Sequence, residues 1–309
     1  MIDAVALRSL VAVERLGSVA AAADSLGYTA SAVSQQVKKL EGQAGVALLE
    51  KYGRGVMLTE AGRLLAASAR DLLAQMEQIE TQLQSTVRRP AGRVRLATFA
   101  TAARGVVAPA LGRLRDVAPD VAVAQREAEP WDAVQLVAGG QVDVAVVHNW
   151  EPLPLHVPDH VQLRVLGTDV ADVLVHRDHR LAGTTGVSAL DLADETWVSV
   201  AAGSICHQWL TKMFHDIGRA PRIGHYAQEF ASHVALAAEG LAVALVPRLG
   251  RGPLPDSVVA LPVHDPVPTR TVSAAWRRTM GASPAVNAVL EVLQEEAGAA
   301  MGPQGMTHR

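Results

Sequence analysis

Residues 18–62 constrain this chain more than any other stretch, because their pattern predicts two short helices followed by a hairpin. Ser18 is suited to cap the first helix, and Gly27 is placed to end it. Thr29 is suited to cap a second helix. The apolar positions of that second helix recur at helical spacing and form one stripe: Val33, Val37 and Leu40. Two such helices joined by a tight glycine turn are typical of a helix-turn-helix.

The opposite face of the second helix carries short hydrogen-bonding side chains and a cationic end. Its residues are Ser31, Ser34, Gln35 and Lys38. Serine and glutamine bond to base edges in a major groove, and glutamine pairs well with adenine. Lys38 lies further along, where phosphates would run. The alternative is the solvated face of an ordinary pair of packed helices, and the helix pair alone does not decide between them.

A predicted hairpin decides between these alternatives. Two short apolar segments, 48–49 and 56–58, flank a turn with a Gly-x-Gly sequence. Lys51 and Arg54 lie near its tip and would reach a backbone phosphate or a minor groove. The pattern therefore predicts a winged helix-turn-helix. The predicted DNA-binding residues are Ser31, Ser34, Gln35, Lys38, Lys51 and Arg54.

The overall charge is the main compositional argument against DNA binding. Residues 1–90 hold ten Lys and Arg against nine Asp and Glu, which gives +1, and residues 91–309 hold eighteen against twenty-two, which gives −4. A non-specific nucleic-acid binder would be strongly basic. A site-specific dimer needs only a local cationic face, so the charge limits the class of binder without excluding DNA.

The N-terminal region resembles the LysR-type transcriptional regulators of bacteria without a gap over about 60 residues. The segments that carry the resemblance are 7–13, Gly17–Ser18, Ala22–Ala23, 31–34, Leu40–Glu41, 53–55 and 58–62. The chain departs from the family at Ala30–Ser31, where Gln-Pro is frequent, and at Gln35, where Arg is frequent. Both departures fall on expected base contacts, so the resemblance does not transfer an operator sequence.

A long helix is predicted after the hairpin, from residue 59 to 86. Apolar residues recur there at alternating spacings of four and three: Leu65, Ala69, Leu72, Met76, Ile79 and Leu83. This spacing favours a dimerisation helix, because no neighbouring helical segment offers a partner. The alternative is a helix packed on its own domain. Residues 88–92 then break the helix and predict a hinge.

From residue 93 short apolar strands alternate with helices, which predicts a parallel α/β sheet with helices on both faces. Two such sets joined by crossing segments near 163–168 and 264–269 resemble a periplasmic-binding-protein-like sensor. We predict these domains: a winged helix-turn-helix at 1–58, a linker helix at 59–89, an effector-binding domain at 90–300 and a disordered tail at 301–309. Its lobe I is 90–163 with 269–300, and its lobe II is 164–268.

In open α/β sheets a ligand binds beyond the carboxyl ends of the strands. Thr98, Phe99 and Thr101 follow the first strand, and Ser204 begins a helix of the second lobe. Hydroxyl-bearing helix starts suit an anion, although each residue alone is explained as an ordinary helix cap. The predicted site for a small, possibly anionic effector comprises Thr98, Phe99, Thr101, His148, Ser204 and Glu229.

Other kinds of site lack support in the sequence. Cys206 is the single cysteine, which excludes an internal disulfide, and His156 and His160 flank Pro158, which argues against a helical metal site. No cofactor motif, signal peptide or membrane span is visible.

We therefore predict a ligand-responsive transcription regulator that binds an operator in double-stranded DNA, has no enzymatic activity and needs no cofactor or metal. The expected location is the cytoplasm, with no membrane partner. The resemblance implies that sensor domains also pair, so that homodimers form a homotetramer. The alternative is a cytoplasmic small-molecule-binding protein or a cryptic enzyme on the α/β lobes, for which a winged helix has no use.

Overall fold

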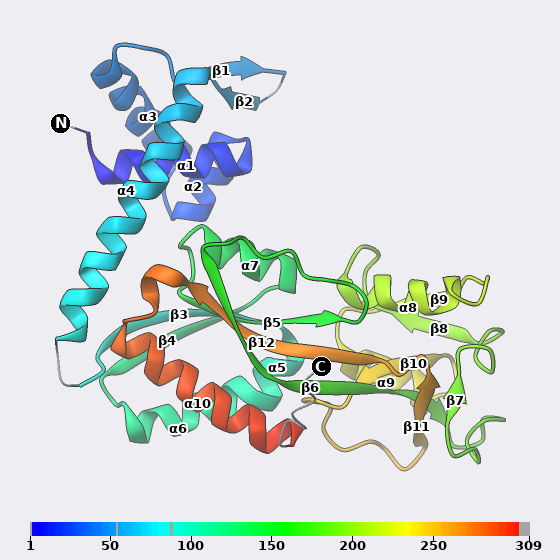
Figure 1. Cartoon of the computed structure of the whole chain (residues 1–309). Coiled ribbons are helices and arrows are strands. Elements are labelled where there is room, and N and C mark those ends of the chain that lie inside the picture. The colour runs from blue at the N-terminus through cyan, green and yellow to red at the C-terminus, as the bar shows by residue number, and fades with distance from the viewer. Residues whose placement is uncertain (1, 54, 87–88, 303–309) are drawn as a thin grey trace. The chain divides into compact units, whose positions relative to one another are not determined.

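The computed structural model describes residues 2–53, 55–86 and 89–302 (Figure 1). The chain divides into two compact units. The first unit holds residues 1–88 with the short segments 139–141 and 278–284, and the second holds the remainder. No helix within the described ranges has the length and apolar character needed to cross a membrane.

Three short helices form the base of the first unit: α1 (Ala4–Leu16), α2 (Val19–Leu26) and α3 (Ala30–Ala44). Their N-terminal caps are Asp3, Ser18 and Thr29, whose side chains accept hydrogen bonds from backbone N–H groups of the first turn. Glycines in the left-handed conformation, Gly17, Gly27 and Gly45, end them. The sequence predictions for these helices are therefore confirmed, and their apolar faces meet in one core that includes Leu7, Leu10, Val33, Val37 and Leu40.

The hairpin follows as β1 (Leu49–Tyr52) and β2 (Gly55–Leu58), an antiparallel pair. A carboxylate oxygen of Glu41, on α3, accepts hydrogen bonds from the backbone N–H groups of Leu48 at 2.9 Å and Leu49 at 3.2 Å. These bonds fix the start of the hairpin to the second helix of the motif.

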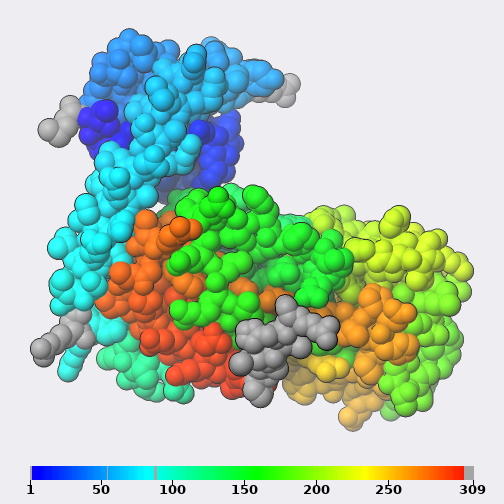
Figure 2. Space-filling model, viewed as in Figure 1, coloured from blue at the N-terminus to red at the C-terminus, as the bar shows by residue number. Residues whose placement is uncertain are grey.

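Helix α4 (Glu60–Ser85) begins at Thr59, whose hydroxyl caps the N–H of Gly62 at 3.0 Å. Its first half packs on its own domain, because Ala66 and Ala69 are fully buried in the core with α1. The expectation that this helix lacks an intramolecular partner was therefore wrong: α1 packs on its first half, and the short 3₁₀ helix η2 (Arg278–Met280) contacts its second half, where Thr81 is buried. Further along, Leu72, Ile79 and Leu83 are 46%, 56% and 66% exposed, and α4 (cyan in Figure 2) shows an open face.

The second unit contains one continuous path of strands in the order β4-β3-β5-β12-β6-β10-β8-β9. Its first half is lobe I, with β3 (Gly92–Thr98), β4 (Val121–Glu127), β5 (Val144–Trp150), β6 (Val161–His176) and β12 (Thr269–Arg277). Helices α6 (Ala108–Val117) and α10 (Pro284–Met301) lie on one side of these strands and α7 (Pro130–Ala138) on the other (Figure 1). Before α6 the chain forms α5 (Ala100–Ala102) and a π-helical turn, η1 (Ala103–Val107).

Lobe II uses the other end of β6. Its strands are β7 (Val187–Ser188), β8 (Thr196–Ser199), β9 (Arg222–Tyr226), β10 (Val243–Pro247) and β11 (Val258–Asp265). Helices α8 (Ile205–His215) and α9 (Phe230–Ala238) cover opposite faces, because alternate residues of β6 and β10 belong to two separate apolar clusters.

The α/β class is confirmed. The predicted parallel sheet is found where β3 pairs with β4 and β5 and where β8 pairs with β9 and β10, but the prediction was wrong for the strands between these sets. β6 runs antiparallel to β10, β11 and β12, and β12 runs antiparallel to β5. The physical reason is that β6 and β12 are the segments that cross between the lobes in opposite directions. β6 starts at Val161, and its first half pairs with β12. Since β6 serves both lobes, the predicted lobe limits remain predictions.

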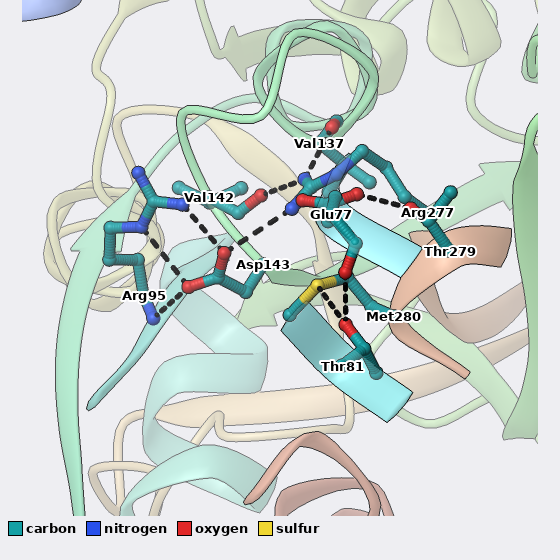
Figure 3. A network of polar contacts seen from close by, with 9 residues as sticks. All are labelled: Glu77, Thr81, Arg95, Val137, Val142, Asp143, Arg277, Thr279 and Met280. Carbon is teal, nitrogen blue, oxygen red and sulfur yellow. Dashed lines mark hydrogen bonds and ion pairs between the residues drawn. The ribbon is translucent and has the colours of Figure 1, made fainter. Parts of the chain in front are cut away.

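An ion network around the buried Asp143 links β3 and β12 of lobe I (Figure 3). Arg95 on β3 binds Asp143 in two places, at 2.6 and 3.1 Å, and Arg277 on β12 binds the same carboxylate at 3.3 Å. Arg277 also donates to the carbonyl groups of Val137 and Val142, at 2.8 and 2.6 Å. Burial alone would raise the pKa of Asp143, but the hydrogen bonds and charge of Arg95, aided by Arg277, hold it below its usual value.

Candidate functional site

Helix α3 places the predicted base-reading residues on one outer face. Ser31, Gln35 and Lys38 are exposed and Ser34 is half-buried, while the apolar stripe on the other side is fully buried. The neighbouring Gln36 points inward instead, where its side chain is hydrogen-bonded to the buried Ser9. The polar face is therefore presented by the packing of the apolar stripe, which fixes the rotation of the helix.

The cations near this face differ in their environment. Lys39 forms an ion pair with Asp3 at 3.2 Å, while Lys38 and Lys51 are exposed and no described acidic group is paired with either. Arg54, the other predicted wing contact, lies outside the described residues. Sequence reasoning passed over Tyr28, which is 44% exposed directly before the cap of α3. Its position between Gly27 and the cap Thr29 was the signal that the sequence offered for it.

In the second unit a buried guanidinium lies where the two lobes meet. Arg270 on β12 is 1% exposed and binds Asp169 of β6 at 2.6 and 2.9 Å. It also donates to the hydroxyl of Thr101 on α5 at 2.8 Å. This charge is neutralised inside the protein, as a buried ion requires. Thr101 is therefore not the cap of its helix, as the sequence alone suggested, but an acceptor for a strand residue.

Aromatic rings surround this guanidinium. Arg270 lies 5.0 Å from the ring centre of Phe99 and 5.6 Å from that of Trp150. His148 packs edge-on against both rings, at 4.5 and 6.2 Å. Burial, aided by the charge of Arg270, lowers the pKa of His148 well below its usual value, so this ring is neutral. The structure thus brings Phe99, Thr101 and His148 together, as predicted, around an arginine that was not predicted.

A pocket opens on the other side of Trp150, at the carboxyl ends of β8 and β10. Its wall takes residues from β5, β8, α8, α9 and β10, among them Trp150, Ser199, Cys206, Phe230 and His233. Its empty volume is about 300 Å³, including the space at its open side. The space that a water-sized probe can enter is only about 20 Å³, well below the size range of small-molecule sites.

Two of the remaining predicted residues, Ser204 and Glu229, come directly before the helices α8 and α9 that line this pocket. Ser204 caps α8, accepting a hydrogen bond from the N–H of His207 at 3.2 Å, and Glu229 is exposed directly before α9. These two helices contribute Cys206 and His233 to the wall. Thr98 is fully buried, and its hydroxyl donates to the carbonyl group of Phe99 at 3.4 Å. The role of all six residues in effector binding stays a prediction.

Polar contacts bind the lobes to each other around Arg270. The segment after β10 is held by two carboxylates of β6: Asp172 binds Arg248 at 2.6 Å, and Asp169 accepts from the N–H of Leu249 at 3.0 Å. Gly250 touches lobe I so closely that an added Cβ would lie 2.2 Å from the carbonyl oxygen of Thr101. Close backbone contacts and ion pairs therefore hold lobe II against α5 and η1 of lobe I.

Two further groups near the pocket carry side chains of kinds that can react chemically. Burial raises the pKa of the Cys206 thiol, which makes it a poor nucleophile. The hydroxyl of Ser199 is hydrogen-bonded to Nδ1 of His207 at 3.1 Å, a pairing that sequence reasoning missed because the residues come from a strand and a helix. Within the described ranges, no group of three or more His, Cys, Asp or Glu side chains could hold a metal ion.

A winged helix-turn-helix followed by a long helix and a two-lobed α/β domain defines a DNA-binding regulator with a sensor. A family model described as "Bacterial regulatory helix-turn-helix protein, lysR family" matches residues 5–63, and one described as "LysR substrate binding domain" matches residues 88–298. The chain therefore belongs to the LysR family of transcription regulators.

Relatives and solved structures agree with this assignment. The small neutral protease regulatory protein of Streptomyces coelicolor is 30% identical over 275 residues, which cover 88% of this chain and 81% of the relative. The probable HTH-type transcriptional regulator LrrA of Synechococcus elongatus is 27% identical over 293 residues, 94% of this chain and 96% of the relative.

Among solved structures, a full-length OxyR variant from Pseudomonas aeruginosa matches with a TM-score of 0.70 at 22% identity, covering 100% of this chain and 99% of that one. Full-length CbnR in complex with its target DNA matches with a TM-score of 0.54 at 19% identity, covering 95% of this chain and 99% of that one. These likenesses show the fold.

Proposed function

We propose that this regulator reads its operator with one face of α3 and holds the DNA backbone with nearby cations. Ser31, Ser34 and Gln35 would contact bases, and Lys38, Lys51 and Arg54 would contact phosphates. The observation that carries the proposal is the exposed polar face of α3, fixed in rotation by its buried apolar stripe. The solved complex of CbnR with its target DNA supports DNA as the partner.

The first experiment is selection of bound fragments from the source genome, followed by titration of the selected operator. Gln35→Ala should weaken operator binding by about 1–3 kcal/mol and relax the preference at one base position. Gln43→Ala, the same residue type near the other end of α3, is the matched control. Unchanged affinity and base preference for Gln35→Ala would show that this docking model is incorrect.

Lys51→Ala tests the phosphate contact separately. It should weaken binding to all sequences alike and reduce the salt slope by about one ion. If the loss depended on operator sequence, Lys51 would be a base-reading residue instead.

The proposed assembly is a homodimer through α4 that pairs again through the sensor domains into a homotetramer. The support is the line of exposed apolar residues in the second half of α4, which would place two recognition helices on neighbouring half-sites. Leu72→Asp with Ile79→Asp should convert the assembly to monomers or sensor-linked dimers in sedimentation velocity. Leu64→Asp replaces another exposed leucine of α4 outside this line and should leave the assembly intact. Wild-type monomers at micromolar concentration would contradict the proposal.

The proposed effector site is the pocket beside Trp150, with Ser204 and Glu229 before the helices that line it and Thr98, Phe99, Thr101 and His148 behind it. A ligand there would contact both lobes, and it would shift the regulator between states only through its different affinity for each. The site of action of such a regulator is the cytoplasm, where operator DNA lies. The expectation that the chain has no enzymatic activity is retained, since the family consists of transcription regulators.

A further inference from the structure

The DNA-binding region, residues 1–58, carries its aromatic side chains on the outside. Before Phe99 the sequence contains two residues with aromatic rings of the Phe, Trp or Tyr type, Tyr28 and Tyr52. The core of this region is built from Ala, Val and Leu side chains, so neither ring packs in it. An aromatic ring gains much free energy when it is buried, and both rings forgo that gain in water. Their exposure therefore indicates a partner that covers them.

Tyr28 lies in the turn between α2 and α3, with its side chain 44% exposed. Its backbone N–H donates to the carbonyl oxygen of Ala23 at 2.9 Å, which fixes it to the end of α2. Gly27 before it is left-handed, and Thr29 after it caps α3. The ring of Tyr28 is therefore held at the N-terminal end of α3. The N-terminal residues of a recognition helix are those that contact DNA.

Tyr52 ends strand β1 beside the turn of the hairpin, and its side chain is 71% exposed. Across the hairpin it pairs with Gly55, which has no side chain to cover the ring. Gly55 also lies against the turn between α1 and α2, where an added Cβ would be 3.2 Å from the carbonyl oxygen of Gly17. The helices therefore support the hairpin at Gly55 as well as at Glu41, and Tyr52 is held out from that support.

The surroundings of both rings suit a polyanion. Lys51 precedes Tyr52 in β1, and Lys38 is exposed on the helix that begins just after Tyr28. A phenol hydroxyl donates to a phosphate oxygen, as other neutral side chains do along a DNA backbone, and the ring supplies an apolar surface for the neighbouring sugar. A tyrosine side chain also has few rotatable bonds, so it loses little conformational entropy when it is covered.

We propose that Tyr28 and Tyr52 are uncharged contacts to the operator backbone, one before the reading face of α3 and one at the hairpin. The hydroxyl of each donates to a phosphate oxygen, and its ring packs on the adjoining sugar. Such contacts set the register in which α3 enters the groove, and they carry no sequence information themselves. This inference rests on the proposed reading face of α3 and adds two residues to the DNA-binding surface.

The third tyrosine of the chain is a built-in control. Tyr226 lies on β9 of the sensor, is 61% exposed and packs beside His207 with 6.3 Å between the ring centres. Nitration of the full-length protein by tetranitromethane, followed by peptide mass spectrometry, measures the access to each phenol separately. Saturating operator DNA should slow the nitration of Tyr28 and Tyr52 and leave that of Tyr226 unchanged. Unchanged nitration of Tyr28 or of Tyr52 would overturn the contact at that residue.

Two further variants test the hydroxyl groups alone, because Tyr28→Phe and Tyr52→Phe keep the rings. Each should weaken binding about 2-fold to 10-fold, which corresponds to one hydrogen bond, and should do so equally on operator and on unrelated duplexes. Tyr226→Phe, the matched control, should leave both affinities unchanged. A phenol displaces no counterion, so the dependence of affinity on salt should keep its wild-type slope, in contrast to Lys51→Ala. A changed slope would overturn the proposed uncharged contact.

Hydrogen exchange separates DNA contact from a role in packing. Exchange in α2 and α3 of unbound Tyr28→Phe should match that of the wild type. Faster exchange there, together with weaker binding, would assign Tyr28 to the packing of α2 and overturn its contact with DNA.

Gln35→Ala separates this inference from the proposed function. If Gln35→Ala weakens operator binding while Tyr28→Phe and Tyr52→Phe do not, the inference is wrong and the reading face stands. If the two tyrosine variants weaken binding and Gln35→Ala does not, the backbone contacts stand and the proposed base contact is wrong.

Discussion

Helix α3 and the pocket beside Trp150 gather their residues in different ways. α3 presents Ser31, Gln35 and Lys38 from one continuous helix, so the spacing along the chain alone decides which side chains share a face. The pocket takes its wall from five elements, and the guanidinium behind it belongs to a strand far along the chain. The face of α3 is therefore determined by the local sequence. The pocket is determined by the order in which distant strands are arranged in the sheet.

The largest test of this contrast is to break the long-range pair behind the pocket. Arg270→Ala would leave Asp169 as an uncompensated buried charge and should destabilise the sensor by about 3–5 kcal/mol. All five tryptophans lie after residue 130, so urea unfolding followed by tryptophan fluorescence reports on this unit. The exposed Arg164 of β6 is the control, and Arg164→Ala should cost less than about 1 kcal/mol.

A double variant separates charge from packing at the same place. Arg270→Met with Asp169→Leu removes both charges and should recover most of the stability lost in Arg270→Ala. A double variant as unstable as the single one would mean that the hydrogen bonds to Thr101 and Leu249, and not the buried charge, dominate.

This pair also shows why the sensor site was only partly predictable. Phe99, Thr101 and His148 lie together in the structure, and their strand positions could be read because each follows or lies within a strand whose apolar run is visible in the sequence. Arg270 was invisible, since a lone arginine in a strand pattern carries no sign of burial, and its partner Asp169 is 101 residues away. The face of α3 was predictable in full, because the alternation of apolar and polar side chains specifies its rotation without reference to any distant residue.

A second test uses the uneven distribution of histidine. All eleven histidines lie after residue 147, and burial lowers the pKa of both His148 and His233. Below pH 6.5 these histidines bind protons in the unfolded chain but stay neutral in the folded sensor. The free energy of unfolding should therefore fall on acidification, by at most about 1.4 kcal/mol per pH unit for each histidine. His148→Phe should flatten the profile between pH 7 and 5.5. An unchanged slope would assign the proton uptake to other groups.

The smallest expected effect probes the local side of the comparison. Thr29→Ala removes the cap of α3, a bond of 3.1 Å to the N–H of Ala32, and should cost about 1 kcal/mol. Hydrogen exchange followed by mass spectrometry should show faster exchange in α3 and no change in the sensor. Thr29→Ser keeps the hydroxyl and should restore protection. Exchange that quickened throughout the chain would contradict the independence of the two regions.

The strand β6 has a mechanical consequence for the sensor. It runs unbroken from Val161 to His176 through both lobes, and its pairing with β12 shifts by one residue at Leu166, a β-bulge near the crossing point. At a bulge the ladder of hydrogen bonds is locally interrupted, and the strand bends and twists more strongly there than elsewhere. We therefore expect the lobes to move by twisting about β6 like a torsion bar. Binding of a molecule would then rotate one lobe slightly relative to the other, and the stiffness of β6 would set the size of that rotation.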